Sequence, residues 1–356
     1  MAYDTLVPLW GEDFTKRYIE FFLPAQLPVL SSLRGERYTL ITTPESERAV
    51  RESQAYRDLS SIMEVRFLPI GTATADYRRM SNAYEVGLRH ADRETTFIFL
   101  TPDALMSLGS MDTVKRLMAG GYRAVMNAGP RVDWQSFAPE FVSMGAMKGI
   151  GARSLAKLLE KHLHLSMRSF MMSGSIFNTH PACLYWEVEA GFVARHFVMH
   201  PIAVRPRRPI RTVEETLDYN LATYVRRSEV YVCTDSDEFL GIDVALRDAN
   251  MKHVHAGSLE DEQIAIWLQS EWPTRFHKWL GRHTVYFHSN GIGPDHLRAA
   301  AEAEATIRRL YRQIPPLGFI YSPRDTLKRM LDPTPLKTFA PWYRTVLDVF
   351  RPPRAD

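Results

Sequence analysis

Cysteine is nearly absent from this sequence, with only Cys183 and Cys233 among 356 residues. Two cysteines cannot build a disulfide framework, and no cysteines and histidines are spaced like the ligands of a structural zinc ion. With so few cysteines, a reducing cytoplasm is the expected compartment.

A long apolar run is missing as well. The longest apolar cluster, Phe21 to Leu23, is interrupted by Pro24 and Pro28, and no segment has the length that a bilayer-spanning helix needs. The first twelve residues lack the basic stretch and apolar core of a signal peptide. The sequence therefore predicts a soluble, cytoplasmic protein.

Charge of one sign is in only slight excess. The chain has 44 Lys and Arg residues against 41 Asp and Glu residues, a formal net charge of +3, and 45% of its residues are hydrophobic. This is an ordinary globular composition. So small an excess does not indicate nucleic acid as a partner, and it is compatible with an anionic ligand such as a diphosphate.

Short apolar runs alternate with helical patterns in the first 135 residues. Helices separate five predicted strands, at 6–10, 38–42, 65–68, 96–100 and 122–126. This alternation predicts crossover connections and a mostly parallel α/β sheet flanked by helices. Ligands of such sheets bind at the carboxyl ends of the strands. The residues that follow the strands are therefore candidates for a site.

Two predicted strands lead into acidic loops. The strand at 96–100 is followed by Asp103, and a later strand at 230–233 is followed by Asp235 and Asp237. A hard divalent cation binds oxygen ligands and can neutralise a diphosphate leaving group. Asp and Ser are also common turn residues, so a single Asp-x-Asp has a purely structural alternative.

Seven segments, taken in their order, resemble GT-A-type glycosyltransferases, and especially uncharacterised bacterial members related to the glycogenin type. They are LVPLWGEDF (6–14), YTLITTPES (38–46), RRMSNAYEVGLRHA (78–91), FIFLTPDALMSLGSM (97–111), FVMHPIAV (197–204), TLDYNL (216–221) and YVCTDSDEF (231–239). The resemblance implies an α/β fold with a GT-A-like mixed sheet flanked by helices and a helical C-terminal extension. It implies a nucleotide-sugar-binding half at 1–135, an acceptor-side half of the same domain at 136–290, and the helical extension and tail at 291–356.

The family resemblance also implies roles for residues near the nucleotide. In the family, the loop after the first strand and the end of the second strand contact the nucleoside, which points to Trp10, Gly11, Thr42 and Thr43 here. Arg78 or Arg79, at the start of the helix at 75–91, could contact the diphosphate. We predict that Arg79 does so. The alternative for this arginine is a solvated helix position.

The metal-binding Asp-x-Asp of the family follows the fourth strand, where this chain has Thr101, Pro102 and Asp103. Thr101 replaces the first aspartate, so the resemblance implies a weakened Mn²⁺ or Mg²⁺ site at Asp103. Either Asp235 and Asp237 compensate, or the protein works without a metal, or catalysis has been lost. His288 is the expected late histidine ligand.

The implied function is transfer of a sugar from a nucleotide-diphosphate donor to an unknown glycan, lipid or protein acceptor. Asp218 resembles the family's acidic residue near the acceptor and is the predicted catalytic residue. Thr101 favours the alternative, a non-catalytic relative that binds a sugar nucleotide or glycan or serves as a scaffold. A hydrolase is disfavoured because no Gly-x-Ser-x-Gly occurs.

A third idea concerns the C-terminal segment at 335–354, in which aromatic and basic residues alternate. An amphipathic helix of this kind can lie on an anionic lipid surface, which would make the protein peripheral to the inner membrane. Helices with such a pattern more often pack on their own domain.

Overall fold

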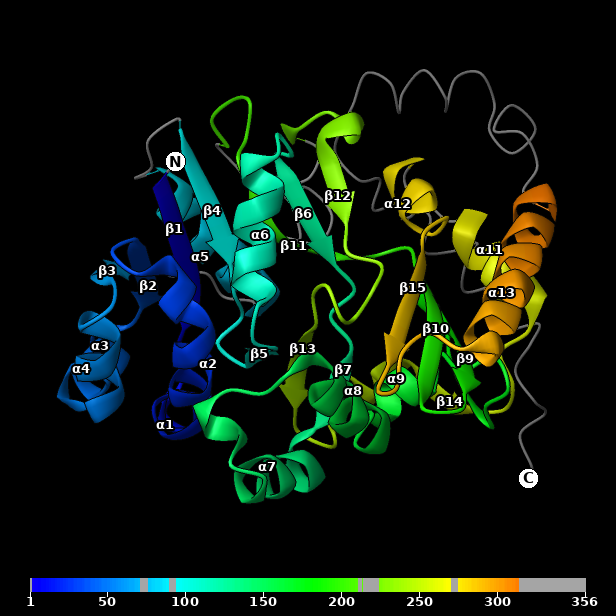
Figure 1. Ribbon diagram of the computed structural model, residues 1–356, viewed down its shortest axis with the longest axis horizontal. Helices are drawn as coiled ribbons and strands as arrows, with labels where there is room; N and C mark the ends of the chain where they lie inside the picture. The colour runs from blue at the N-terminus through cyan, green and yellow to red at the C-terminus, as the bar shows by residue number, and fades with distance from the viewer. Residues whose placement is uncertain are drawn as a thin grey trace, which may run out of the picture.

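The computed structural model describes residues 2–70, 76–89, 94–210, 213, 224–269 and 275–313. A seven-stranded sheet forms its centre, in the order β12-β6-β11-β4-β1-β2-β3 (Figure 1). The strands are β1 (Ala2–Leu9), β2 (Arg37–Thr42), β3 (Glu64–Pro69), β4 (Thr95–Phe99), β6 (Ala124–Asn127), β11 (His200–Val204) and β12 (Val230–Val232).

Strand β11 is antiparallel to both of its neighbours, and the other pairings of this sheet are parallel. All five strands predicted within the first 135 residues belong to the sheet. The side chains of β1, β2, β4 and β6 are mostly buried because helices flank the sheet, which is why these strands read as apolar runs. Strand β3, at the edge of the sheet, is mostly only partly buried. The predicted α/β class with a mixed sheet flanked by helices is confirmed.

The helices that surround the sheet are α1 (Glu12–Arg17), η1 (Tyr18–Phe22), α2 (Leu23–Leu30), α3 (Pro44–Glu52), α4 (Gln54–Ser60), α5 (Asp76–Arg89), α6 (Ser110–Ala119), α7 (Trp134–Ser143), α8 (Ala152–Lys161) and α9 (Leu165–Arg168). Helix α5 packs on β1 and β2, and α6 packs on β6. Gly87 allows α5 to approach closely, since a Cβ there would lie 2.9 Å from a methyl group of Leu6.

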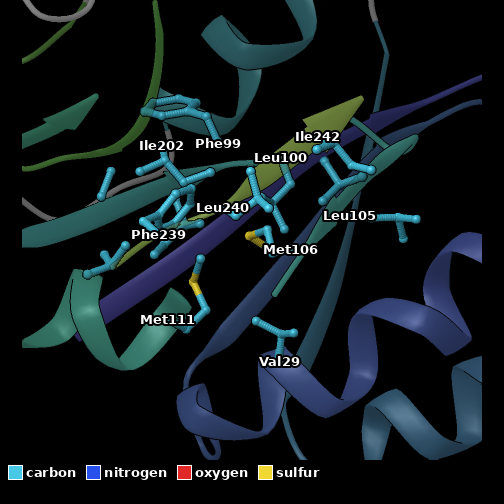
Figure 2. Close-up of a cluster of buried hydrophobic side chains, with 14 of the residues drawn as sticks. Val29, Phe99, Leu100, Leu105, Met106, Met111, Ile202, Phe239, Leu240 and Ile242 are labelled. Carbon is cyan, nitrogen blue, oxygen red and sulfur yellow. The ribbon is translucent and has the colours of Figure 1, made fainter. Parts of the chain in front are cut away.

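A small sheet at the carboxyl ends of the main strands carries part of the candidate site. It has the order β5-β13-β7, with β5 (Ala104–Met106), β13 (Gly241–Ala245) and β7 (Arg131–Asp133). Figure 2 shows the buried side chains that attach it to the main sheet. Phe99 and Leu100, at the end of β4, gather there with Leu105, Met106 and Ile242, which come from β5 and β13.

A third sheet lies beside the main sheet, on the right in Figure 1. It has the order β15-β10-β9, with β9 (Cys183–Val188), β10 (Gly191–His196) and β15 (Thr284–His288). Tyr185, Phe192 and Phe287 belong to the main core. The alternate residues of the same strands form a second cluster with α11 (Asp261–Gln269) and α13 (Pro294–Gln313).

Strand β11 begins at His200, and α12 (Arg275–Leu280) comes after α11 in the chain. A two-stranded sheet pairs β8 (Ile176–Asn178) with β14 (Val254–Ala256). The predicted C-terminal extension begins with α13, which packs against β9 and β10.

Candidate functional site

The order of the strands in the main sheet reverses between β1 and β4. Strands β2 and β3 continue from β1 on one side, whereas β4 pairs with β1 on the other side. Because β1 and β4 are parallel, Trp10 and the segment Thr101 to Asp103 leave the sheet at the same edge. Open α/β sheets bind ligands at such a switch point. We call this place the switch-point edge.

Trp10 and Arg79 lie together at the switch-point edge. The Arg79 guanidinium carbon is 5.8 Å from the centre of the Trp10 ring, which is a cation–π distance. Gly11 follows with a φ of 86°, a conformation that glycine adopts without strain, and α1 begins directly after it. Trp10, which follows β1, and Arg79, near the start of α5, thus lie together although they are far apart in the sequence.

The hydroxyl groups of Thr42 and Thr43 have partners within the protein. Thr42 is buried, and its hydroxyl donates to the Leu9 carbonyl at 2.6 Å. Thr43 caps α3, where its side-chain oxygen accepts from the Ser46 amide at 3.3 Å. Gly11 and Thr43 also line one groove between α1 and α3. Contact of these residues with a nucleoside stays a prediction.

Two carboxylates, Asp103 and Asp243, meet beyond the end of β4. Strand β13 pairs with β5 so that Asp243 lies opposite Ala104, and the Val244 amide donates to the Asp103 carbonyl at 3.1 Å. Burial and the neighbouring charge of Asp243 raise the pKa of Asp103 to about 6. The two groups are therefore close enough to repel each other when both are ionised.

Thr101 and Arg131 contact this pair. The Thr101 hydroxyl donates to Asp243 Oδ1 at 3.3 Å, and a hydrogen bond from Thr101 also favours the ionised form of Asp103. Arg131 of β7 forms an ion pair with Asp243 at 3.9 Å, and its charge also acts on Asp103. The carboxylate and hydroxyl oxygens of Thr101, Asp103 and Asp243 are ligands that Mg²⁺ and Mn²⁺ accept.

Asp243 is the residue that the sequence analysis missed. Its only local signal is a single carboxylate within the apolar run from Phe239 to Ala245. That run alternates between buried and partly exposed positions, which identifies a strand but not its partner. The pairing of β13 with β5, which are separated by more than a hundred residues, is what brings Asp243 to Asp103.

A second cluster contains Asp235, Asp237 and His288, whose potential ligand atoms all lie within 4.8 Å of one another. These three predicted metal ligands lie together, and their binding of a metal stays a prediction. Among the residues that the structure describes, Asp103 is not part of this group. The convergence of Asp103 with Asp235 and Asp237 in one metal cluster is therefore not found.

Hydrogen bonds within the protein already occupy this second cluster. The Gly291 amide donates to His288 Nδ1 at 3.1 Å, so the neutral ring carries its proton on Nε2 and donates it to Asp235 Oδ1 at 2.9 Å. Asp235 Oδ1 also accepts from the Asp237 amide at 2.8 Å. A metal at His288 Nε2 would require the other tautomer and would displace the Gly291 bond.

Asp237 is also engaged, because Arg153 of α8 donates to both of its carboxylate oxygens. The Nε atom lies 3.2 and 3.1 Å from the two oxygens, and Nη2 lies 2.8 Å from Oδ2. The bonds from Arg153, with a smaller contribution from His288, lower the pKa of Asp237. The cluster could hold a cation only after losing these contacts.

The predicted catalytic residue, Asp218, lies outside the described residues, as does the C-terminal segment at 335–354. In the part of the chain that the structure describes, none of the helices combines the length and apolar character needed to cross a membrane.

Comparisons with known proteins reveal only distant similarity, and only to structures. No protein-family model matches the sequence, and no curated protein is significantly similar to it. The solved structure of S. aureus TarS is 10% identical over 91% of this chain and 45% of TarS, with a TM-score of 0.32. Apo UDP-glucose pyrophosphorylase is 9% identical over 88% of this chain and 99% of that chain, with a TM-score of 0.29.

Mouse xyloside xylosyltransferase 1 is 12% identical over 40% of this chain and 59% of that chain, with a TM-score of 0.25. The matches to TarS and to the xylosyltransferase cover less than two thirds of those proteins. TM-scores of this size assign no activity to this chain.

Proposed function

We propose that the switch-point edge binds a nucleoside-diphosphate sugar together with a divalent cation and that the protein transfers the sugar to an acceptor. The observation that carries this proposal is the meeting of Asp103 and Asp243 beyond β4. In this proposal Asp243 supplies the second carboxylate of the cation site. The sequence analysis considered Asp235 and Asp237 for this role.

Electrostatics support a cation between these two residues. Ionising Asp103 beside Asp243 in a partly buried place costs free energy, as its raised pKa indicates. A divalent cation offers opposite charge to both carboxylates at once, so binding would relieve the repulsion that the pair now carries. Thr101, whose hydroxyl bonds to Asp243, would offer a third oxygen in place of the family's first aspartate.

The residues around the pair suit the rest of the ligand. Trp10 offers an aromatic face for a base, and Arg79 carries a positive charge next to that face for a diphosphate. As the bond between sugar and diphosphate breaks, negative charge develops on the leaving diphosphate, and preorganised positive groups lower the barrier. A bound Mn²⁺ or Mg²⁺ would supply Lewis-acid stabilisation of that charge.

The cluster of Asp235, Asp237 and His288 has a structural role in this proposal. Its hydrogen bonds attach the loop after β12 to β15, and the ion pair of Asp237 with Arg153 attaches the same loop to α8. Asp218 remains the proposed base, acting on an acceptor hydroxyl.

Calorimetric titration with a panel of nucleoside diphosphates, in Mn²⁺ and in EDTA, tests the site. Asp103→Asn and Asp243→Asn should each weaken the Mn²⁺-dependent binding by about tenfold or more and leave binding in EDTA unchanged. Asp237→Asn is the matched control, because it removes an equivalent charge from the other cluster and should keep the Mn²⁺ effect. Equal affinity in all four proteins would contradict the proposal, and a loss confined to Asp237→Asn would move the cation to the second cluster.

A non-catalytic sugar-nucleotide-binding protein is the second candidate. The observation that favours it is Thr101, whose hydroxyl already bonds to Asp243 in the place of a metal-binding aspartate. Hydrolysis of a bound donor sugar separates the two functions. An enzyme should hydrolyse the donor slowly without an acceptor, and Asp218→Ala should abolish that turnover while sparing binding. Tight binding with no turnover in any variant would establish the non-catalytic function.

A further inference from the structure

Positive charge is concentrated on α12 and beside the amino ends of β6 and β12 and the carboxyl end of β11, at the end of the main sheet opposite to the switch-point edge. We call the residues concerned the basic face. They are Arg123, Arg205, Arg207, Arg208, Arg226, Arg227, Arg275, Lys278 and Arg282.

The basic face is far more positive than the chain as a whole. Among the described residues, Glu229 is the one carboxylate that forms an ion pair with any of its members, through Arg207. The charges of Glu229 and Glu94 both act on Arg123, so two carboxylates lie near the cations of this face. Such segregation of charge is a property of an interaction surface rather than of the fold.

Hydrogen bonds join the segments of the basic face. Arg123, which precedes β6, accepts at its carbonyl from the Arg205 amide at 2.7 Å and donates its own amide to the Glu229 carbonyl at 2.8 Å. The Arg207 amide donates to the Tyr224 carbonyl at 3.3 Å. Burial, followed by the charges of Arg205 and Arg207, lowers the pKa of Arg123. The cations are thus close enough to repel one another.

Aromatic side chains accompany these cations. The Arg208 guanidinium carbon lies 5.3 Å from the Tyr224 ring centre, and that of Arg227 lies 5.6 Å from the Trp279 ring centre. The second contact attaches α12 to the segment before β12. In Figure 1, α12 and the start of β12 lie at the top, whereas β5 and β13 lie below the main sheet.

The described chain also ends at this face. The Tyr311 hydroxyl near the end of α13 donates to the Lys278 carbonyl at 2.5 Å, and Arg282 lies over the Tyr311 ring. The sequence continues from there to residue 356 with further basic residues and with Trp342, Tyr343 and Phe350. Arginine combined with Trp and Tyr is the composition that proteins present to the headgroups of an anionic membrane.

We propose that the basic face binds the surface of a membrane that contains anionic lipid. Arginines contact the headgroup phosphates, while Trp279 and Tyr224 lie at the boundary between headgroups and water. Because the basic face and the switch-point edge are at opposite ends of the sheet, the bound protein presents its nucleotide-binding edge to the solution. This inference does not depend on the proposed transferase activity.

Co-sedimentation of the full-length protein with vesicles tests the proposal. The vesicles are phosphatidylcholine alone or phosphatidylcholine with phosphatidylglycerol. The triple variant Arg208→Glu, Arg226→Glu, Arg275→Glu reverses three exposed charges of the basic face. Its control, Arg48→Glu, Arg57→Glu, Lys157→Glu, makes the same change in net charge on exposed positions elsewhere.

Wild type and the control should bind the anionic vesicles, less at high salt, and the triple variant should bind them at least about tenfold more weakly. Circular dichroism establishes that each variant is folded, and Arg208→Ala or Arg226→Ala alone replaces a triple variant that does not fold. Equal vesicle binding by the triple variant and the control overturns the proposal. Equal binding of the wild type to vesicles with and without phosphatidylglycerol also overturns it. Binding of an RNA oligonucleotide but not of vesicles, lost in the triple variant, assigns the face to nucleic acid instead.

Discussion

Asp103 shows how one residue of the candidate site bears on stability. Its carboxyl is partly buried beside Asp243, and its pKa is raised to about 6 from an ordinary value near 3.8. A group with a raised carboxyl pKa stays protonated in the native state at a pH where the unfolded chain has already released the proton. The native state therefore loses stability relative to the unfolded state as pH rises through this interval.

At the residue scale we predict that Asp103→Asn stabilises the protein at pH 7, by about 3 kcal/mol at most. The gain should shrink as the pH falls from about 6 and disappear only below about pH 3, because Asp103 is then protonated in both states. Urea denaturation of wild type and variant between about pH 3 and pH 7 measures the difference in free energy of unfolding. A difference that does not change with pH would show that Asp103 titrates normally.

Asp237→Asn provides the comparison with the opposite sign. Arg153 lowers the pKa of Asp237, so ionisation of this carboxylate stabilises the native state above its unfolded pKa, and that stability is lost as the pH falls. The ion pair is partly exposed, so its removal should cost less than about 1 kcal/mol at pH 7. The ionised Asp237 carboxylate stabilises the native state, whereas the ionised Asp103 carboxylate destabilises it. A residue that lowers stability in this way is expected at a functional site.

At the element scale, the antiparallel pair β10 and β15 depends on Gly191. Gly191 has a φ of 152°, and a Cβ at this position would lie 2.0 Å from the Phe287 carbonyl oxygen of the neighbouring strand. The Phe287 oxygen is a backbone atom, and the backbone of residue 191 fixes the position of the added Cβ. No side-chain rotation can therefore relieve the contact. Strands β10 and β15 must separate, or the turn between β9 and β10 must shift.

We therefore expect Gly191→Ala to lower the free energy of unfolding by about 3 kcal/mol or more, as measured by chemical denaturation. Gly293→Ala is the matched control, because no atom lies within 4 Å of its added Cβ. The control should remain within about 0.5 kcal/mol of wild type. If Gly191→Ala were equally mild, β10 and β15 could not be paired as described.

At the scale of the whole molecule, two hydrophobic clusters share the β15-β10-β9 sheet. One face of the sheet belongs to the main core, and the other face packs against α11 and α13. Arg195 connects the parts of the second cluster. It is 1% exposed, donates from Nη1 to the Arg282 carbonyl after α12, and pairs through Nη2 with Glu304 of α13 at 2.9 Å.

Arg195→Ala should destabilise the second cluster by about 3 kcal/mol, since it empties a buried position and leaves the Arg282 carbonyl without its donor. Hydrogen exchange followed by mass spectrometry should show faster exchange in α13 and β10, with β1 and β2 unchanged. Arg308→Ala removes an exposed partner of the same Glu304 and should have little effect. Uniformly faster exchange throughout the protein would indicate one cooperative unit instead of two clusters.

Much of the fold could be predicted from the sequence, for local reasons. The strands β1, β2, β3, β4 and β6 are apolar runs separated by helical patterns, and both signals depend only on neighbouring residues. The parallel order then placed Trp10, Thr42 and Asp103 at the carboxyl ends of the strands. The α/β class and the switch-point edge could therefore be predicted from local patterns of apolar and polar residues.

The rest was decided by contacts between distant segments. Strand β11 enters the middle of the sheet antiparallel to its neighbours, and β13 pairs with β5, and neither partner is specified by local periodicity. Asp243 reaches Asp103 for this reason, while hydrogen bonds to His288 and an ion pair with Arg153 engage Asp235 and Asp237 elsewhere. The sequence alone determined which residue types were available for a cation, and the tertiary structure decided which of them meet, because pairing over long separations depends on the packing of the whole sheet.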